Sequence, residues 1–167
     1  MKLTQERLKE LLHYCPALGL FWWKERNGND RHTKRWNTRY ANQIAGSLNA
    51  DGYPVVTLEK APRPLHRLAW FWMTGEWPED QIDHSNGRKL DIAFENLREA
   101  TSSQNLANRF GWSKSGMKGA YRKPNGRYQA QITNGPTESL GTYDTPEEAH
   151  AVAMARLREI HGEFSRA

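Results

Sequence analysis

Asp83, His84, Asn96 and Asn105 bring a carboxylate, an imidazole and two carboxamides into one short stretch of the chain. Asp83 and His84 are adjacent at the predicted end of a strand, and Asn105 lies one turn into a predicted helix. If that helix packs back across the strand, Asn105 can meet Asp83 or His84. Carboxylate and carboxamide oxygens suit a hard cation such as Mg²⁺ or Mn²⁺, and a neutral imidazole beside it is a natural general base for water.

The same side chains also have a purely structural interpretation. In that interpretation Asp83 and Asn86 cap turns, Asn96 fixes a backbone corner, and His84 has no chemical role. The spacing of these residues alone does not decide between a metal site and a loop in which they have only structural roles.

The elements expected around these residues form a strand, a loop, a second strand and a helix. The segments QIDHS and ENLREAT predict the strands, and SNGRK predicts the turn between them. Thr101 followed by Gln104 is typical of a capping box, so we expect a helix over TSSQNLANR.

Upstream, the pattern alternates short helices and strands. We expect a helix over residues 4–14 behind a Thr4 cap, a strand over GLFWW, and a hairpin around Asp51-Gly52. A further helix is expected from Pro64 to near Gly75. Residues 24–39 contain six basic and two acidic residues and predict a polar loop or mobile arm.

The composition changes from Gly111, where GWSKSG has the character of a linker. Three short strands are expected over KGAYRK, GRYQAQIT and TESLGTY. Thr145, Pro146 and two glutamates then predict a last helix, which Gly162 ends. The predicted fold class is α+β, with a three-stranded antiparallel sheet packed on one helix at the C-terminal end.

The segment Ile82–Arg109, with LHRLAW before it, resembles the HNH endonuclease family with the ββα-metal fold. The likeness covers the DH pair, the NG turn, the ENL triplet thirteen residues after Asp83, and an Asn nine residues beyond Asn96. It implies a nuclease module over residues 1–110, with its ββα-metal core at about 78–109. The implied activity is hydrolysis of a DNA phosphodiester.

By that likeness His84 would be the catalytic base, and Asn96 would brace the hairpin and His84. Asp83 and Asn105 would hold one divalent cation, Mg²⁺ or Mn²⁺. Because Asp83 is the only anionic ligand implied, we expect weak metal binding, near millimolar levels, until substrate phosphate completes the site. His66, in the LHRLAW segment, is expected to have a structural role.

The strand GRYQAQI places Arg127, Gln129 and Gln131 on one face, where they can meet phosphates and base edges. A merely solvated sheet face would show the same alternation. Residues 117–161 resemble the APETALA/ethylene-response-factor DNA-binding domain, which reads DNA with its sheet. That resemblance implies a DNA-binding domain over 111–167 and a set of contacts: Lys118, Tyr121, Arg122, Lys123, Arg127, Tyr128, Gln129 and Gln131.

Charge and composition fit a protein that binds a polyanion. The chain of 167 residues has a net charge of +5 and a pI near 9.4, which favours double-stranded DNA as a partner. Its single cysteine excludes an internal disulfide framework and is typical of a reducing compartment. No apolar run is long enough for a membrane span, no N-terminal secretory signal is evident, and no protein partner is indicated.

Together the two resemblances predict a phage-borne homing or nicking endonuclease that acts in the cytoplasm of an infected bacterium. Two alternatives remain open on the sequence alone. One is a sequence-specific DNA-binding regulator whose nuclease module is inert, and the other is an RNA-binding or structure-specific protein.

Overall fold

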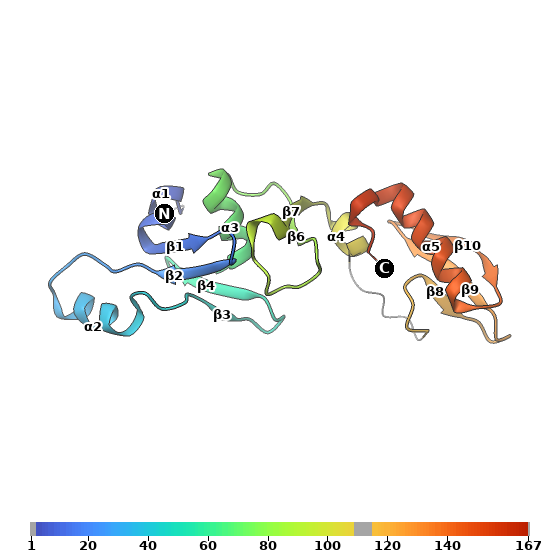
Figure 1. Cartoon of the computed structure of the whole chain (residues 1–167), viewed down its shortest axis with the longest axis horizontal. Coiled ribbons are helices and arrows are strands. Elements are labelled where there is room, and N and C mark those ends of the chain that lie inside the picture. The colour runs from blue at the N-terminus through green and yellow to red at the C-terminus, as the bar shows by residue number, and fades with distance from the viewer. Residues whose placement is uncertain (1–2, 109–114, 167) are drawn as a thin grey trace. The chain divides into compact units, whose positions relative to one another are not determined.

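The computed structural model describes residues 3–108 and 115–166, which form two compact units, Met1–Glu99 and Ala100–Ala167. The mixture of helices and short antiparallel strands confirms the α+β class (Figure 1). The boundary between the units falls before the domain boundary predicted after residue 110. The predicted linker GWSKSG lies largely outside the described residues. Within the described ranges, no helix has the length and apolar character needed to cross a bilayer.

The first unit begins with α1 (Gln5–Leu11), β1 (Leu12–Cys15) and β2 (Leu20–Trp23). The Thr4 side chain caps α1 by accepting from the Arg7 amide at 3.2 Å, as predicted. The helix is shorter than expected, because residues 12–15 pair with β2 instead of continuing it. The remaining elements are α2 (Arg31–Tyr40), β3 (Ser47–Leu48), β4 (Pro54–Leu58), β5 (Ala61–Pro64), α3 (Leu65–Thr74), β6 (Gln81–His84), the 3₁₀ turn η1 (Phe94–Asn96) and β7 (Leu97–Ala100).

One expectation for this unit was wrong, and one strand was missed. The polar segment 24–39 is not a loop, because α2 occupies most of it and Asp30 caps its start by accepting from the Thr33 amide. The helix expected from Pro64 to near Gly75 is confirmed as α3, but the sequence did not predict β5, which pairs with β4 ahead of it. Two prolines in β5 obscured it, since proline is uncommon in paired strands.

The core of the first unit is built from both of its halves. Leu8, Leu12 and Phe21 come from the N-terminal elements, and Leu68 comes from α3; all four are fully buried. The tryptophans on and after α3 pack against this core. The strands β1 and β2 form the first hairpin of the chain. Because α3 and this first hairpin share one core, they hold β6 and β7, which follow α3, in a fixed place.

The loop between β6 and β7 rests on the first hairpin. Tyr14 donates its hydroxyl proton to the Ile92 carbonyl at 2.6 Å, and the Phe94 amide donates to the Pro16 carbonyl at 2.9 Å. Gly19, at φ +66°, lies against the backbone of Ile92 and Ala93, where a Cβ atom would overlap both. The hairpin therefore shapes the loop by direct backbone contact.

The second unit contains α4 (Ser102–Asn108), β8 (Ala120–Arg122), β9 (Tyr128–Thr133), β10 (Thr137–Tyr143), α5 (Pro146–His161) and the 3₁₀ turn η2 (Gly162–Phe164). The strands pair in the order β10-β9-β8, and small side chains let the sheet approach α5 closely: Ala120, Ala130, Ala149 and Ala153 are all buried. The helix α5 starts at the predicted Thr145 cap, and Glu148 completes a capping box with it. The predicted strands and last helix are thus present.

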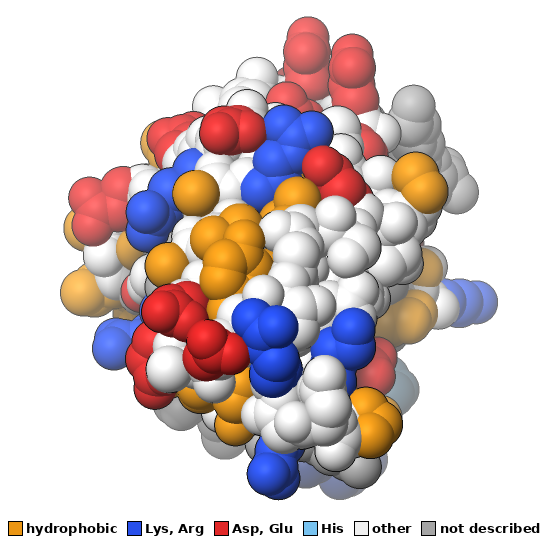
Figure 2. Space-filling model, turned by 90° about the vertical axis from the view of Figure 1, so that its right-hand side faces the viewer, with side chains coloured by type: hydrophobic (Ala, Val, Ile, Leu, Met, Phe, Trp, Pro, Cys, Tyr) orange, Lys and Arg blue, Asp and Glu red, His pale blue; other side chains and the backbone are white. Residues whose placement is uncertain are grey.

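Charges of both signs lie on the face drawn in Figure 2, which looks onto the side where α5 and β10 lie in Figure 1. Asp and Glu side chains stand among Lys and Arg there, so this face is not a uniformly basic patch. The described part of the second unit has nearly as many acidic as basic residues. Charge alone therefore does not mark it as the main site of polyanion binding.

Replacing Gly19 by alanine should destabilise the first unit far more than the same change at Gly52. Both glycines have positive φ, +66° and +78°, so both substitutions cost roughly 1 kcal/mol of backbone strain. Only at Gly19 does the new methyl group meet backbone, and we expect a further loss of several kcal/mol there. Urea unfolding followed by tryptophan fluorescence measures this; equal losses in the two variants would contradict the contact.

Candidate active site

The loop that joins β6 to β7 is held by the side chain of Asn96. Its Oδ1 accepts from the Ser85 hydroxyl at 2.8 Å and from the Asn86 amide at 2.9 Å, and its Nδ2 donates to the Asp91 carbonyl at 2.7 Å. The side chain is only 6% exposed. Asn96 therefore links the two ends of the loop to its middle, which is the geometry of a bracing residue; its part in catalysis stays a prediction.

Asp91 continues this polar network inside the loop. Its Oδ2 accepts from the Asn86 Nδ2 at 2.6 Å, and its Oδ1 accepts from the Ala93 amide at 3.3 Å. Gly87, at φ +67°, makes the turn, and its amide donates to the His84 carbonyl at 2.7 Å. The backbone at His84 is thus fixed by the turn that follows it.

Asp83 lies on β6 and is 4% exposed. Its Oδ2 accepts from Nε of Arg98, on β7, at 3.0 Å. A buried carboxylate is costly without a partner, and Arg98 supplies the opposite charge across the two-stranded sheet. Sequence reasoning missed Arg98; the signal available was an opposite charge on the strand predicted to pair with β6.

His84 is buried beside a second imidazole. Its ring centroid lies 5.2 Å from that of His66, on α3, and 6.2 Å from that of Tyr53, just before β4. Burial lowers the pKa of His84, although the nearby charge of Asp83 acts in the opposite direction. A lowered pKa favours the neutral imidazole, which is the form that can accept a proton.

His66 faces His84 from the α3 side. Burial lowers the pKa of His66 to about 4, and the neighbouring His84 and Arg67 add to the effect. Its Nδ1 is buried and has no hydrogen-bond partner among the described residues. The spacing of residues in the sequence could not reveal that a buried, unbonded nitrogen of His66 lies beside the predicted catalytic base. The LHRLAW segment indicated only a structural role for His66.

Arg67 and Lys89 fix the surroundings of this pair of histidines. Arg67 donates to the carbonyls of Asp80 at 2.6 Å and Pro78 at 3.2 Å, which ties α3 to the segment entering β6. Lys89 donates to the Asp51 carbonyl at 3.1 Å, and its ammonium lies 4.5 Å from the centroid of the Tyr53 ring. The loop therefore contacts the β3–β4 turn as well as the first hairpin.

The residues present fit a weakly held cation better than a dedicated metal cage. Within residues 3–108 and 115–166, no group of three or more His, Cys, Asp or Glu side chains is arranged to hold a metal ion. The predicted donor set contains one carboxylate and one carboxamide, so it would not form such a group. Arg98 competes with a cation for the buried carboxylate of Asp83, so a hard cation held there would bind weakly and take its other ligands from water and substrate.

Asn105, the second predicted ligand, lies on α4, which belongs to the second unit. Neighbouring Ala107 is buried in a cluster with Ile132, Met154 and Leu157, and Ser103 donates to Asn134 Oδ1 at 2.6 Å. The expected capping box is present, since the Thr101 amide donates to Gln104 Oε1 at 2.8 Å. The helix expected to complete the ββα motif is thus held by contacts within the second unit, and the ligand role of Asn105 stays a prediction.

The predicted DNA contacts of the second unit separate onto two faces of its sheet. In the strand register Tyr121 aligns with Gln129, while Arg122 aligns with Tyr128. Tyr128 packs in the apolar cluster under α5, so it and Arg122 point to the helix side. The open face keeps Tyr121, Gln129 and Gln131, while Lys123 and Arg127 lie in the turn between β8 and β9.

Two of the predicted basic contacts are already engaged within the protein. Lys118 Nζ donates to the carbonyls of Ala107 and Arg166, and burial lowers its pKa to about 8. Arg127 forms an ion pair with Asp144 at 2.8 Å and donates to the Thr142 carbonyl. DNA binding by either residue would have to compete with these contacts, and both roles stay predictions.

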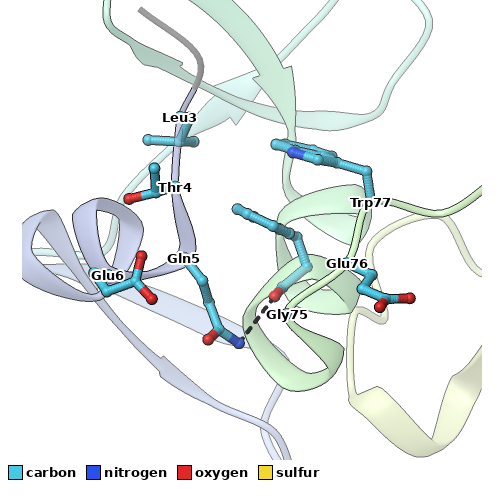
Figure 3. A pocket seen from close by; sticks show the side chains of 8 residues that line it. Leu3, Thr4, Gln5, Glu6, Gly75, Glu76 and Trp77 are labelled. Carbon is cyan, nitrogen blue, oxygen red and sulfur yellow. Dashed lines mark hydrogen bonds between the residues drawn. The ribbon is translucent and has the colours of Figure 1, made fainter.

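A separate cleft of about 500 Å³ lies between the start of α1 and the end of α3 (Figure 3). Gln5 crosses it and donates to the Trp72 carbonyl at 2.7 Å and to the Phe71 carbonyl at 3.2 Å, near the end of α3. The charged side chains that line it are Glu6 and Glu76. An acidic cleft without a cation is poorly suited to a phosphate, so it is not the candidate site.

Comparison with known proteins finds a family match for the segment that contains these residues. Residues 63–107 match the HNH endonuclease family, and this segment includes His66 and all four residues singled out at the start. An uncharacterized HNH endonuclease of Acanthamoeba polyphaga mimivirus, L560, is 31% identical over 121 residues, which is 71% of this chain and 63% of that protein. The chain thus spans less than two thirds of this relative's length. No solved structure matches this chain.

The predicted HNH segment is therefore confirmed as a sequence match over residues 63–107. The family match ends before the predicted APETALA/ethylene-response-factor segment, which rests on its own pattern. Phage origin also stays a prediction, since the relative belongs to mimivirus.

Acidification should destabilise the first unit through His66. The unfolded chain takes up a proton near the ordinary pKa of 6.5, whereas the folded chain does so only near 4. Stability is therefore lost as the pH falls from 6.5 to 4, by up to about 3 kcal/mol, and His84 acts in the same direction. Urea unfolding across this range should give a shallower pH dependence for His66→Phe than for wild type or for His13→Phe, an exposed control. An unchanged slope in His66→Phe would rule out this assignment.

Loss of the Asn96 side chain should destabilise the loop. Asn96→Ala leaves the Ser85 hydroxyl, the Asn86 amide and the Asp91 carbonyl without this partner, and we expect a loss of about 3 kcal/mol. Asn105→Ala, on α4, should change the unfolding of the first unit by no more than about 0.5 kcal/mol. Thermal unfolding of both variants checks this; a fully stable Asn96→Ala protein would show that Asn96 is not a brace.

Proposed function

We propose that the chain is a metal-dependent DNA endonuclease that nicks or cuts duplex DNA with one HNH-type site. The observation that carries the proposal is the buried His84 on β6, held beside Asp83 by a braced loop within the segment that matches the HNH endonucleases. Family membership of that segment supports a nuclease acting on DNA.

In this proposal His84 accepts a proton from the attacking water. Burial keeps its pKa below the ordinary value, so the imidazole is neutral and able to accept at neutral pH. The bond from water oxygen to phosphorus forms as the bond to the departing 3′ oxygen breaks, and that oxygen then takes up a proton. Asn96 acts as a positioning residue by holding the loop that fixes the His84 backbone.

Asp83 and Asn105 are the residues that would hold one Mg²⁺ or Mn²⁺ ion. When bound, the cation supplies positive charge to the phosphate and to the departing oxygen. Asp83 is supported by its burial on β6 next to His84, and Asn105 by the resemblance alone. With one carboxylate in the set, we expect saturation at roughly millimolar metal.

The second unit would contribute duplex binding through the open face of its sheet. Tyr121, Gln129 and Gln131 share that face in the strand register, and Lys123 and Arg127 lie where β8 ends and β9 begins, which supports a groove-reading role of the APETALA/ethylene-response-factor kind. A free-standing homing or nicking enzyme of phage origin, acting inside an infected bacterium, is the biological setting that fits this combination.

Plasmid cleavage tests the proposal. Supercoiled plasmid incubated with the protein should become nicked or linear with Mg²⁺ or Mn²⁺, and should stay supercoiled with EDTA. His84→Ala should lose about 10²–10⁴-fold in cleavage rate while binding duplex DNA within a few-fold of wild type. His13→Ala, at an exposed histidine of the same unit, is the matched control and should cut normally.

Three results would each contradict a part of this proposal. Binding without cleavage, on plasmid and on phage and bacterial DNA alike, would favour the DNA-binding regulator with an inert nuclease module. Cleavage that survives in His84→Ala would mean that another residue is the base. Stronger binding of structured RNA than of duplex DNA would favour the RNA-binding alternative.

A further inference from the structure

The helix α2 presents a continuous arc of positive charge. At about 100° per residue, Arg31, Lys34, Arg35 and Arg39 fall within an arc of about 140° around its axis. Thr38 lies inside that arc and His32 at its edge. The four basic side chains and Thr38 are all exposed, so the arc is open to solvent.

The opposite side of α2 fixes it to the first unit. Trp36 meets Trp23, on β2, edge to face with ring centroids 5.5 Å apart, and the Arg26 guanidinium stacks 3.7 Å from the Trp36 ring centroid. Asn37 both accepts from the Arg26 amide at 3.0 Å and donates to the Arg26 carbonyl at 2.9 Å. Two points of attachment hold the charged arc in one orientation, which lowers the entropy cost of binding.

The positive charge of this arc is not balanced within the described chain. Asp30 is the only acidic residue from 26 to 40, and both of its oxygens are engaged by Thr33, at 3.0 and 2.6 Å. Among the described residues, no carboxylate lies within ion-pair distance of the four arc cations. This differs from the second unit, where Arg127 and Arg156 are paired with acids.

A groove of about 350 Å³ lies at one edge of the arc, between Arg35 and Arg39 and the Trp36 side of the helix. Arg26, Arg35 and Arg39 line it together with Trp36 and Tyr40, so cations stand around an aromatic floor. Guanidinium groups in such a setting suit phosphate oxygens, which they can bind with two hydrogen bonds.

We propose that α2 binds the phosphate backbone of duplex DNA outside the cut site. In Figure 1, α2 lies well away from β6 and β7 within the first unit, so its contacts would lengthen the DNA footprint and not touch the reacting phosphate. This rests on the proposed function for the choice of duplex DNA as ligand. Contacts to phosphates alone add affinity without sequence preference.

The salt dependence of binding tests this inference. A triple variant, Arg31→Gln/Arg35→Gln/Arg39→Gln, is compared with Lys9→Gln/Lys60→Gln/Arg158→Gln, which removes the same charge from exposed sites elsewhere. Anisotropy of a short labelled duplex in EDTA, from about 50 to 200 mM salt, gives the affinity and its salt slope without cleavage. Circular dichroism verifies that both variants are folded.

The α2 variant should bind at least about tenfold more weakly at low salt and reduce the slope of log K against log salt by about 2 to 3. The control should change the slope by less than half as much. With Mg²⁺, the α2 variant should raise KM and leave kcat at saturating DNA near the wild-type value.

An unchanged slope in the α2 variant, or an equal change in the control, would overturn the inference. A lost kcat at saturating DNA would also overturn it, because α2 would then act at the cut site. The binding measurement needs no cleavage, so the two proposals fail separately. If the wild-type protein cuts no DNA but the α2 variant still loses salt-dependent binding, only the nuclease proposal is refuted. An α2 variant that binds duplex normally yet no longer binds an acidic protein would reassign the arc to a protein partner.

Discussion

The loop that carries the candidate site has little regular structure of its own, and its shape depends on close contact with the first hairpin. Gly19 meets the backbone of Ile92 and Ala93, and Tyr14 donates to the Ile92 carbonyl from a buried position. Only glycine combines the positive φ and the missing Cβ that this contact requires. The N-terminal elements are therefore part of the site's support, although none of them lies within the segment that matches the HNH endonucleases.

The polar network of the site depends on this contact between the first hairpin and the loop. The fixed backbone at residues 91–94 gives Asn96 a carbonyl to donate to, and Asn96 in turn orders Ser85 and Asn86, directly after His84. Buried polar groups of this kind stabilise one loop conformation because each would be costly without its partner. Burial also keeps His84 and His66 neutral, so the support and the proposed chemistry have the same physical origin.

The distribution of charge suggests how the two units would share DNA binding. The basic side chains of the second unit are partly engaged by its own acids and carbonyls, whereas α2 keeps an arc of cations without ion pairs among the described residues. Salt-dependent attraction would then come mainly from the first unit, and side chains such as Gln129 and Gln131 would add groove contacts from the second. Such a division separates affinity from sequence preference.

Much of the local structure was determined by the sequence itself. Caps such as Thr4, Thr101 and Thr145 start helices where they were predicted, because a cap depends only on residues within one helical turn. The identity of Asp83, His84 and Asn96 as one cluster could also be predicted, since a short loop between paired strands brings its ends together.

Tertiary structure alone decided the rest. The helix α2 was missed because its apolar anchor, Trp36, finds Trp23 only after folding, and β5 because pairing with β4 overcame two prolines. Arg98 and the ring contact of His66 with His84 likewise join separate elements. Sequence patterns report interactions between near neighbours along the chain, whereas burial, pKa and ion pairing depend on which distant segments meet.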